Sequence, residues 1–211
     1  MRYLTLNVSH CSYTKKGNCY LRTKMTFQFK IKLNNITNPP VWRRLVVPGN
    51  FTFNQFHYII QDAFGWDNYH LFSFSPGGFT TYPVISDPEM YDEDEEDIID
   101  SDEITLAEIF KAEGQKFSYL YDFGDYWLHS ITVEKLIDIT LETADCTGGK
   151  GACPPEDCGG APGYQHLKQI LADPKNPEHE SMKEWLGLEP DEKWDADYFD
   201  LEEAQEAVRE I

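Results

Sequence analysis

The sequence has no apolar run of about 18 residues, and its N-terminus lacks the apolar segment of a signal peptide. We therefore expect neither a membrane-spanning helix nor export, which predicts a cytoplasmic protein with no membrane partner. Cysteine is scarce too: the chain of 211 residues has five, an odd number in a protein too long to need a disulfide framework. Reduced thiols are the expectation.

Basic residues are few as well, with 18 Lys and Arg against 37 Asp and Glu and a net charge of −19. A protein this acidic repels phosphate backbones unless its basic residues form a separate patch, so nucleic acid is not the expected partner. The basic residues gather in residues 2–32 and at Arg43 and Arg44. The chain is 41% apolar and 14% aromatic, which predicts a folded globular protein.

The hydrophobic pattern switches between strand and helix periods along the chain. Alternation and turn residues predict strands over residues 26–33, 41–47, 66–74, 79–82, 117–121 and 127–133, with strand character continuing through residue 139. Helical spacing and capping residues predict helices over residues 53–64, 104–112, 164–172, 178–186 and 201–210. Strands come mostly first and helices last, which predicts an α+β fold with a largely antiparallel mixed sheet packed by helices. The order of elements at the start of the domain, a strand pair followed by a helix and further strands, also permits a β-grasp-like core with C-terminal helices.

Three further segments differ from this pattern. Residues 1–24 show no clean period and are predicted to be an N-terminal appendage, whereas residues 25–211 are predicted to form a single domain. Residues 87–103 contain eleven acidic residues and no basic one, which predicts a solvated loop. Residues 145–163 are rich in Gly, Pro and Cys and are predicted to be a loop.

The most informative segment is YLYDFGDYWLHSITVE, residues 119–134, in which a polar turn joins two predicted strands. Gly tolerates positive φ and Asp bonds its own backbone, so the DFGD sequence predicts a tight turn. The turn places Asp122 and Asp125 at the mouth of a hairpin. Alternation places Trp127 and His129 on the same face as core-type residues. The hairpin therefore predicts either a binding pocket or a well-fixed turn.

The loop over residues 145–163 contains the CPPED motif with Glu156 and Asp157. If this loop folds over the hairpin, its carboxylates meet Asp122, Asp125 and His129. Carboxylates with an imidazole suit Mg²⁺, Mn²⁺ or Zn²⁺, so one hypothesis is a divalent metal site made of these residues. The competing interpretation is structural: the aspartates cap the turn, and the CPPED acids begin the next element.

The cysteines of the same loop support a second metal hypothesis. Cys146, Cys153 and Cys158, with His129 or His166, could form a tetrahedral zinc site. The spacings of six and four residues between the cysteines do not match the usual zinc knuckle, so free thiols are the alternative. Cys153 could also act as a nucleophile with His129 as base, but the acidic residues that follow it would raise its thiol pKa.

Several blocks of the sequence, taken in order, resemble one family. They are PPVWRRLVVPG, FHYIIQDAFGW, HLFSF, YLYDFGDYWLH, CTGGKGACPPEDCGG and DPKNPEH. Together these blocks resemble the plasmid pRiA4b ORF-3-like family over nearly the whole chain after residue 25. The resemblance implies a single α+β domain in a cytoplasmic bacterial or archaeal protein, and some members look like passengers of plasmids and insertion elements. It implies no activity. The family often has a second histidine where this chain has Phe72, and Cys158 lies at a variable position.

The expected function is a binding or adaptor module rather than an enzyme. Its partner would be an unknown protein or small molecule bound in a pocket near the YDFGDYWLH hairpin and the CPPED loop. One alternative is a metal-dependent hydrolase or nuclease-like enzyme that uses the hairpin carboxylates and His129. Another is an accessory protein for mobile-element DNA transactions, which would have to bind DNA through residues 2–32, Arg43 and Arg44.

Overall fold

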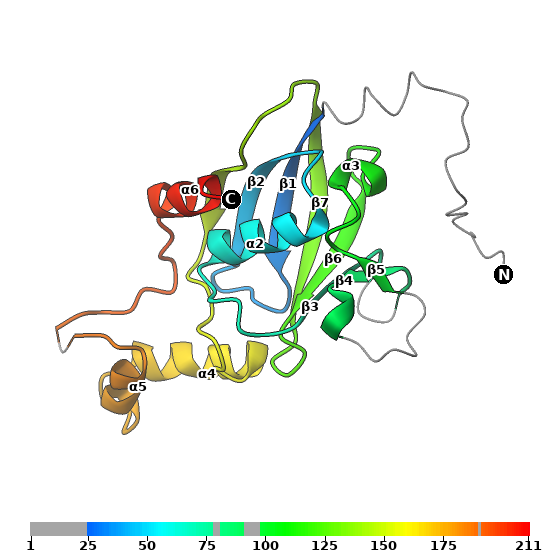
Figure 1. The fold of residues 1–211 in the computed structure, drawn as a ribbon. Helices are drawn as coiled ribbons and strands as arrows, with labels where there is room; N and C mark the ends of the chain where they lie inside the picture. Colours follow the sequence, from blue (N-terminus) through cyan, green and yellow to red (C-terminus); the bar gives the residue numbers. More distant parts are fainter. Residues whose placement is uncertain (1–24, 78–80, 91–97, 190) are drawn as a thin grey trace, which may run out of the picture.

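The computed structural model of the chain describes residues 25–77, 81–90, 98–189 and 191–211 (Figure 1). Its strands are β1 (Thr26–Leu33), β2 (Trp42–Pro48), β3 (Phe72–Ser75), β4 (Val84–Ser86), β5 (Ile98–Asp100), β6 (Lys116–Tyr121), β7 (Trp127–Ile137) and β8 (Asp145–Lys150). Its helices are α2 (Phe53–Phe64), the 3-10 turn η1 (Pro88–Met90), α3 (Leu106–Ile109), α4 (Gly160–Ala172), α5 (His179–Trp185) and α6 (Leu201–Arg209). The predicted N-terminal appendage lies outside the described residues.

The strands form one sheet in the order β5-β4-β3-β6-β7-β1-β2-β8. All neighbouring strands are antiparallel except β4 and β5, which are parallel. The predicted α+β fold with a largely antiparallel mixed sheet is therefore confirmed. Within the described ranges, no helix is both long and apolar enough to cross a membrane.

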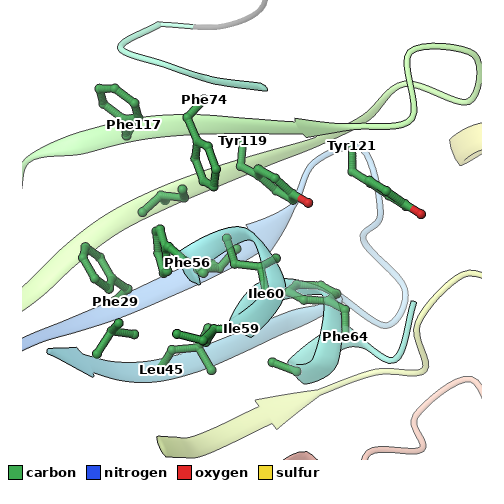
Figure 2. Packing of buried hydrophobic residues seen from close by; sticks show 14 of the residues in the cluster. Phe29, Leu45, Phe56, Ile59, Ile60, Phe64, Phe74, Phe117, Tyr119 and Tyr121 are labelled. Atoms are coloured by element: carbon green, nitrogen blue, oxygen red, sulfur yellow. The ribbon is translucent and has the colours of Figure 1, made fainter. Parts of the chain in front are cut away.

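The hydrophobic core lies between one face of this sheet and α2, which runs across it (Figure 1). Inward residues of the central strands form this layer: Phe29 of β1 and Phe74 of β3 contact Phe56 of α2, and Tyr119 of β6 packs on Phe74 (Figure 2). The ring centroids of Phe29 and Phe56 are 4.8 Å apart, and those of Phe56 and Phe74 are 5.7 Å apart. Burying a side chain of this size contributes about 1.5–3 kcal/mol, so this aromatic layer is a main source of stability.

The boundaries of α2 agree with those predicted from its caps. Thr52 accepts a hydrogen bond from the backbone N–H of Gln55, whose side chain accepts one from the backbone N–H of Thr52. Gly65 ends the helix in the left-handed conformation, with φ of 89°. His57 of this helix is a buried core residue whose two ring nitrogens contact Tyr119 and Asn68.

The prediction that residues 145–163 form a loop is wrong at both ends. Residues 145–150 form β8, because the edge of β2 supplies backbone partners to a segment without strand-like side chains. Gly149 packs under the ring of Phe199, where an added Cβ would come within 2.6 Å of the ring. α4 begins at Gly160 rather than at residue 164, since Pro162 is tolerated in the first turn of a helix.

Other predicted boundaries were too long. Of the predicted strand 66–74, only residues 72–74 are extended, as part of β3, and the predicted helix 104–112 is reduced to Leu106–Ile109. β3 pairs with β4, residues 84–86, and with β6; of the predicted strand 79–82, residues 81 and 82 are not extended, and residues 79 and 80 lie outside the described residues. The predicted acidic loop contains η1 and β5, and β5 pairs with β4 because its two isoleucines can lie in the sheet. Residues 91–97 lie outside the described part of the chain.

Candidate functional site

The β6–β7 hairpin carries Asp122 in a fixed orientation at its turn. Asp122 has a left-handed backbone with φ of 54°, a conformation that Asp tolerates better than most residues. Its Oδ1 accepts a hydrogen bond from the backbone N–H of Gly124 at 2.8 Å, as the DFGD pattern predicts. Its side chain is buried, and the second carboxylate oxygen points away from the turn toward His70.

The CPPED loop does fold against this hairpin. The indole N–H of Trp66 donates to the backbone oxygen of Pro154 at 2.9 Å. The hydroxyl of Tyr121 donates to Glu156 Oε1 at 2.8 Å, and the backbone N–H of Gly159 donates to Asp125 Oδ2 at 3.0 Å. These contacts join β6, the turn of the hairpin and the segment after α2 to one loop, and they fix the position of Glu156.

The loop and the hairpin place three carboxylates around the imidazole of His70. The Nε2 atom of His70 lies 3.4 Å from Asp157 Oδ1, 3.8 Å from Glu156 Oε2 and 3.9 Å from Asp122 Oδ2. His70, Asp122 and Asp157 form a group of possible metal ligands whose donor atoms lie within 4.8 Å of one another. It is the only such group among the residues that the structure describes.

Two polar atoms of this cluster are buried without a hydrogen-bond partner in the described residues, which is unusual for a histidine surrounded by carboxylates. His70 Nε2 and Glu156 Oε2 are inaccessible to solvent, yet neither atom makes a hydrogen bond within the described part of the chain. Burial raises the pKa of Glu156, an effect that its hydrogen bonds with Tyr121 and Asp67 partly offset. Buried polar atoms usually have partners, so two inward-facing atoms without one indicate a position suited to a bound ion.

Two residues predicted for this site lie elsewhere, in the core. Trp127 and His129 are on the inner face of β7, with accessible fractions of 1% and 0%. The His129 ring packs edge-on against Phe64 and Trp66 at 5.0 and 5.3 Å, and burial lowers its pKa to about 3. Asp125 lies at the same turn as Asp122, but its carboxylate caps the loop at Gly159.

The cysteines proposed as zinc ligands do not join a group of metal ligands in the described residues. Cys146 is buried on β8, and Cys153 lies in the loop before the CPPED acids. Burial raises the pKa of both thiols, and it raises the pKa of Cys158 to about 12. Thiols with raised pKa values are poor nucleophiles at neutral pH, so the geometry offers no support for Cys153 as one.

His70 is the residue of the cluster that the sequence pattern did not indicate. It was included in the predicted strand 66–74, although the strand begins only at Phe72. Asn68, with a left-handed φ of 57°, bends the chain before it and turns the His70 imidazole toward the CPPED loop. The polar pair Asp67-Asn68 is the signal that could have identified a loop at this position.

Gly160, at the start of α4, fits directly against the hairpin turn. Its φ is +66°, and an added Cβ would lie 2.5 Å from the backbone oxygen of Asp125. We expect Gly160→Ala to lower the free energy of unfolding by about 2–4 kcal/mol, because it adds a steric conflict to an unfavourable φ. Gly187→Ala is the matched control, since Gly187 has a φ of +68° with open space around it. Urea unfolding checks this; equal losses in both variants would show that the contact with Asp125 does not matter.

The fold and the site together define an α+β protein in which a loop closes over a β-hairpin around one histidine and three carboxylates. The chain belongs to the family described as Plasmid pRiA4b ORF-3-like protein, which matches residues 25–203 and confirms the resemblance seen in the sequence. It is 37% identical over 164 residues to Uncharacterized protein y4hQ of Sinorhizobium fredii, covering 76% of this chain and 80% of that protein. It is also similar to the crystal structure of a protein of unknown function, MM3350, from Methanosarcina mazei Go1. That structure shares 30% identity at a TM-score of 0.70, covering 85% of this chain and 97% of the other.

Proposed function

We propose that this protein is a binding module whose functional group is a divalent cation held by His70, Asp122, Glu156 and Asp157. The observation that carries the proposal is the Nε2 atom of His70, which is inaccessible and has no hydrogen-bond partner among the described residues, while three carboxylate oxygens lie 3.4–3.9 Å away. Three of the ligands are residues of the predicted pocket, and His70 takes the role that the sequence suggested for His129.

The spacing of the donor atoms supports this proposal. Ligands of a cation bound at about 2.0–2.2 Å lie roughly 3–3.5 Å from one another, only slightly closer than the carboxylate oxygens lie to His70 Nε2. The donor atoms of His70, Asp122 and Asp157 all lie within 4.8 Å of one another. One imidazole and three carboxylates suit Mn²⁺ or Zn²⁺, and Mg²⁺ less well because it prefers oxygen ligands and retained waters. The cation would also neutralise acids that the fold holds close together.

The proposed role of the cation is to fasten the CPPED loop to the hairpin and to present a coordination position to a ligand. Asp157 is the outermost group, with 77% of its side chain exposed, so the site opens to solvent on that side. A hollow of about 290 Å³ adjoins it and is lined by Asp157, Cys158, Gly163, His166, Leu167, Met182 and Trp185. A small molecule or a side chain of a protein partner could reach the cation from this hollow.

Titration of the metal-free chain with Mn²⁺ and Zn²⁺ by calorimetry tests the proposal. We expect one cation per chain, and we expect Asp122→Asn and His70→Gln to weaken its affinity more than about tenfold. Asp122→Asn is the sharper variant, because asparagine keeps the Oδ1 acceptor for Gly124 and removes only the charge facing His70. At a free concentration 100 times the dissociation constant, the cation would stabilise the fold by about 2.7 kcal/mol.

Two variants serve as controls for this titration. His166→Gln changes an exposed histidine outside the cluster and is expected to leave the affinity unchanged. Asp125→Asn changes the residue that caps Gly159 rather than one that faces His70. The same affinity in Asp122→Asn as in the unmodified chain would refute the proposed ligand set, and so would a loss confined to Asp125→Asn.

The same geometry makes a metal-dependent hydrolase a second candidate, which the exposed side of the cluster favours. A cation with an open position can lower the pKa of a bound water and generate a nucleophile at neutral pH. Hydrolysis of bis(p-nitrophenyl) phosphate in the presence of Mn²⁺ tests this candidate. Activity that disappears in His70→Gln would support it, whereas no activity in a chain shown to hold the cation would leave the binding role.

A further inference from the structure

The face of the sheet opposite α2 carries a concentration of basic residues. Cross-strand neighbours share a face of a sheet, so the register places Lys30 beside Arg44 and Thr132, and Lys32 beside Trp42 and Ser130. The cations at outward positions of β1, β2, β6, β7 and β8 are Lys30, Lys32, Arg44, Lys116, Lys135 and Lys150. The acids at outward positions of these strands are Glu134 and Asp145, and Asp145 is paired with Arg209 of α6 at 2.9 Å.

This arrangement contrasts with the rest of the molecule. The chain has a net charge of −19, yet the outer face of the central strands has an excess of positive charge. Arg44 is paired with Glu134 at 2.6 Å and Lys150 with Asp197 at 3.2 Å, while Lys32, Lys116 and Lys135 are exposed. At physiological salt the Debye length is about 8 Å, so a ligand on this face responds mainly to these cations and not to acids on the far side.

The outer face also has an aromatic side chain among its cations. Trp42 is half-buried, with the ammonium of Lys30 4.8 Å and the guanidinium of Arg44 5.1 Å from its ring centroid. A shallow hollow of about 680 Å³ lies beside it and is lined by Gln28, Arg44, Gly114, Thr132, Val133, Glu134 and Lys135. α2 and α6 both contact the sheet and contribute to the core on the other face.

We propose that this outer face is a binding surface for single-stranded nucleic acid. Proteins that bind single strands without sequence preference combine cations that follow the phosphates with an aromatic ring on which a base stacks. An open β-sheet that presents an aromatic residue between basic ones is one way to meet both needs. An acidic polypeptide would use the cations but would have no need of the ring, so Trp42 favours nucleic acid. The proposal is independent of the cation site, which lies at the end of the β6–β7 hairpin.

Fluorescence anisotropy of a labelled 20-nucleotide deoxythymidine strand tests the proposal with the full chain. We expect affinity in low salt that falls as salt rises, with a logarithmic slope of about −2 to −3 if three or four phosphates are neutralised. Replacing two of the three exposed lysines, in Lys32→Glu/Lys135→Glu, is expected to reduce the affinity at least tenfold. Trp42→Leu is expected to reduce it about tenfold while leaving the salt slope unchanged, because stacking releases no counterions.

The matched control is Lys175→Glu/Lys193→Glu, which makes the same change in net charge at exposed positions around α4 and α5. It is expected to alter the affinity less than twofold. Equal weakening by both double variants would show that only net charge matters and would overturn the assignment to this face. Binding of polyglutamate in place of the strand would identify an acidic polypeptide as the ligand, and absence of binding at low salt would refute the proposal.

Discussion

Arg43→Met is expected to lower the free energy of unfolding by about 3–5 kcal/mol, although Arg43 pairs with no carboxylate in the described residues. Its Nε donates to the backbone oxygen of Ala63 at 2.7 Å. One terminal nitrogen contacts the oxygens of Trp42, Lys150 and Gly151 at 3.0–3.2 Å. Methionine would leave these carbonyls without their donor in a site that is only 3% exposed.

The position of Arg43 explains why the loss is expected to be large. Its guanidinium lies between the rings of Phe64 and Phe199, 4.9 and 4.3 Å from their centroids. Through these hydrogen bonds and ring contacts, one side chain links the last turn of α2, the edge of the sheet and the segment before α6. Burial lowers its pKa, but an arginine stays charged, so the carbonyl dipoles and the rings must stabilise the cation.

Urea unfolding of three variants separates this role from a general effect of charge. Arg43→Lys keeps the charge but not the planar arrangement of donors, and we expect it to lose part of the same energy. Arg209→Met removes a half-exposed arginine that bonds Asp145 at 2.9 Å, and we expect a change below about 1 kcal/mol. A loss for Arg43→Met no larger than that of Arg209→Met would mean that the carbonyls find other partners.

Much of the fold could be predicted from local patterns. β1 and α2 have the predicted bounds, because strict alternation in one and a capping box with a final glycine in the other define their ends. β8 could not be predicted in this way, since its sequence, DCTGGK, has no strand pattern. Its pairing with β2 and the packing of Phe199 on Gly149 are tertiary contacts.

Only part of the candidate site could be predicted, because local sequence positions some of its residues and tertiary contacts position the others. Asp122 is positioned by its own turn, so its sequence neighbours were sufficient to indicate it. The positions of Glu156 and Asp157 depend on the fold of a loop, so their place beside the hairpin could be predicted only on the condition that this loop folds over it. His70 depends on the end of a predicted strand, which is the least reliable part of such a prediction. His129 was correctly placed on the core-type face, but the sequence could not show that this face closes completely over it.

Acid is expected to destabilise the protein through His57 and His129, the buried histidines of the described residues. His57 accepts from the hydroxyl of Tyr119 through Nδ1 at 2.8 Å, because its Nε2, 2.6 Å from the amide oxygen of Asn68, must carry the proton. Both nitrogens of His129 lack a partner in the described residues. Burial lowers the pKa of His57 to about 4 and that of His129 to about 3, and the charge of Arg43 also acts on His129.

The sign of the effect follows from the two states of the chain. The unfolded chain takes up these protons near pH 6.5, whereas the folded chain resists them until about pH 4 or 3. The contribution of the neutral histidines is thus complete above pH 6.5 and is lost progressively as the pH falls toward the folded values. Glu156 and Asp62 act in the opposite direction, because burial raises their pKa values and the folded chain binds their protons more readily.

A comparison of variants isolates the histidine contribution from these acids. His129→Leu replaces a buried ring that makes no hydrogen bond, so we expect little loss of stability at pH 7. The free energy of unfolding of this variant, relative to that of the unmodified chain, is expected to be about 2–3 kcal/mol higher at pH 4.5 than at pH 7. The reason is that leucine takes up no proton in the unfolded chain. His166→Leu, which removes an imidazole at an exposed position, is the matched control. Urea unfolding at both pH values measures this difference, and parallel pH profiles for His129→Leu and the unmodified chain would mean that His129 can be protonated without opening the core.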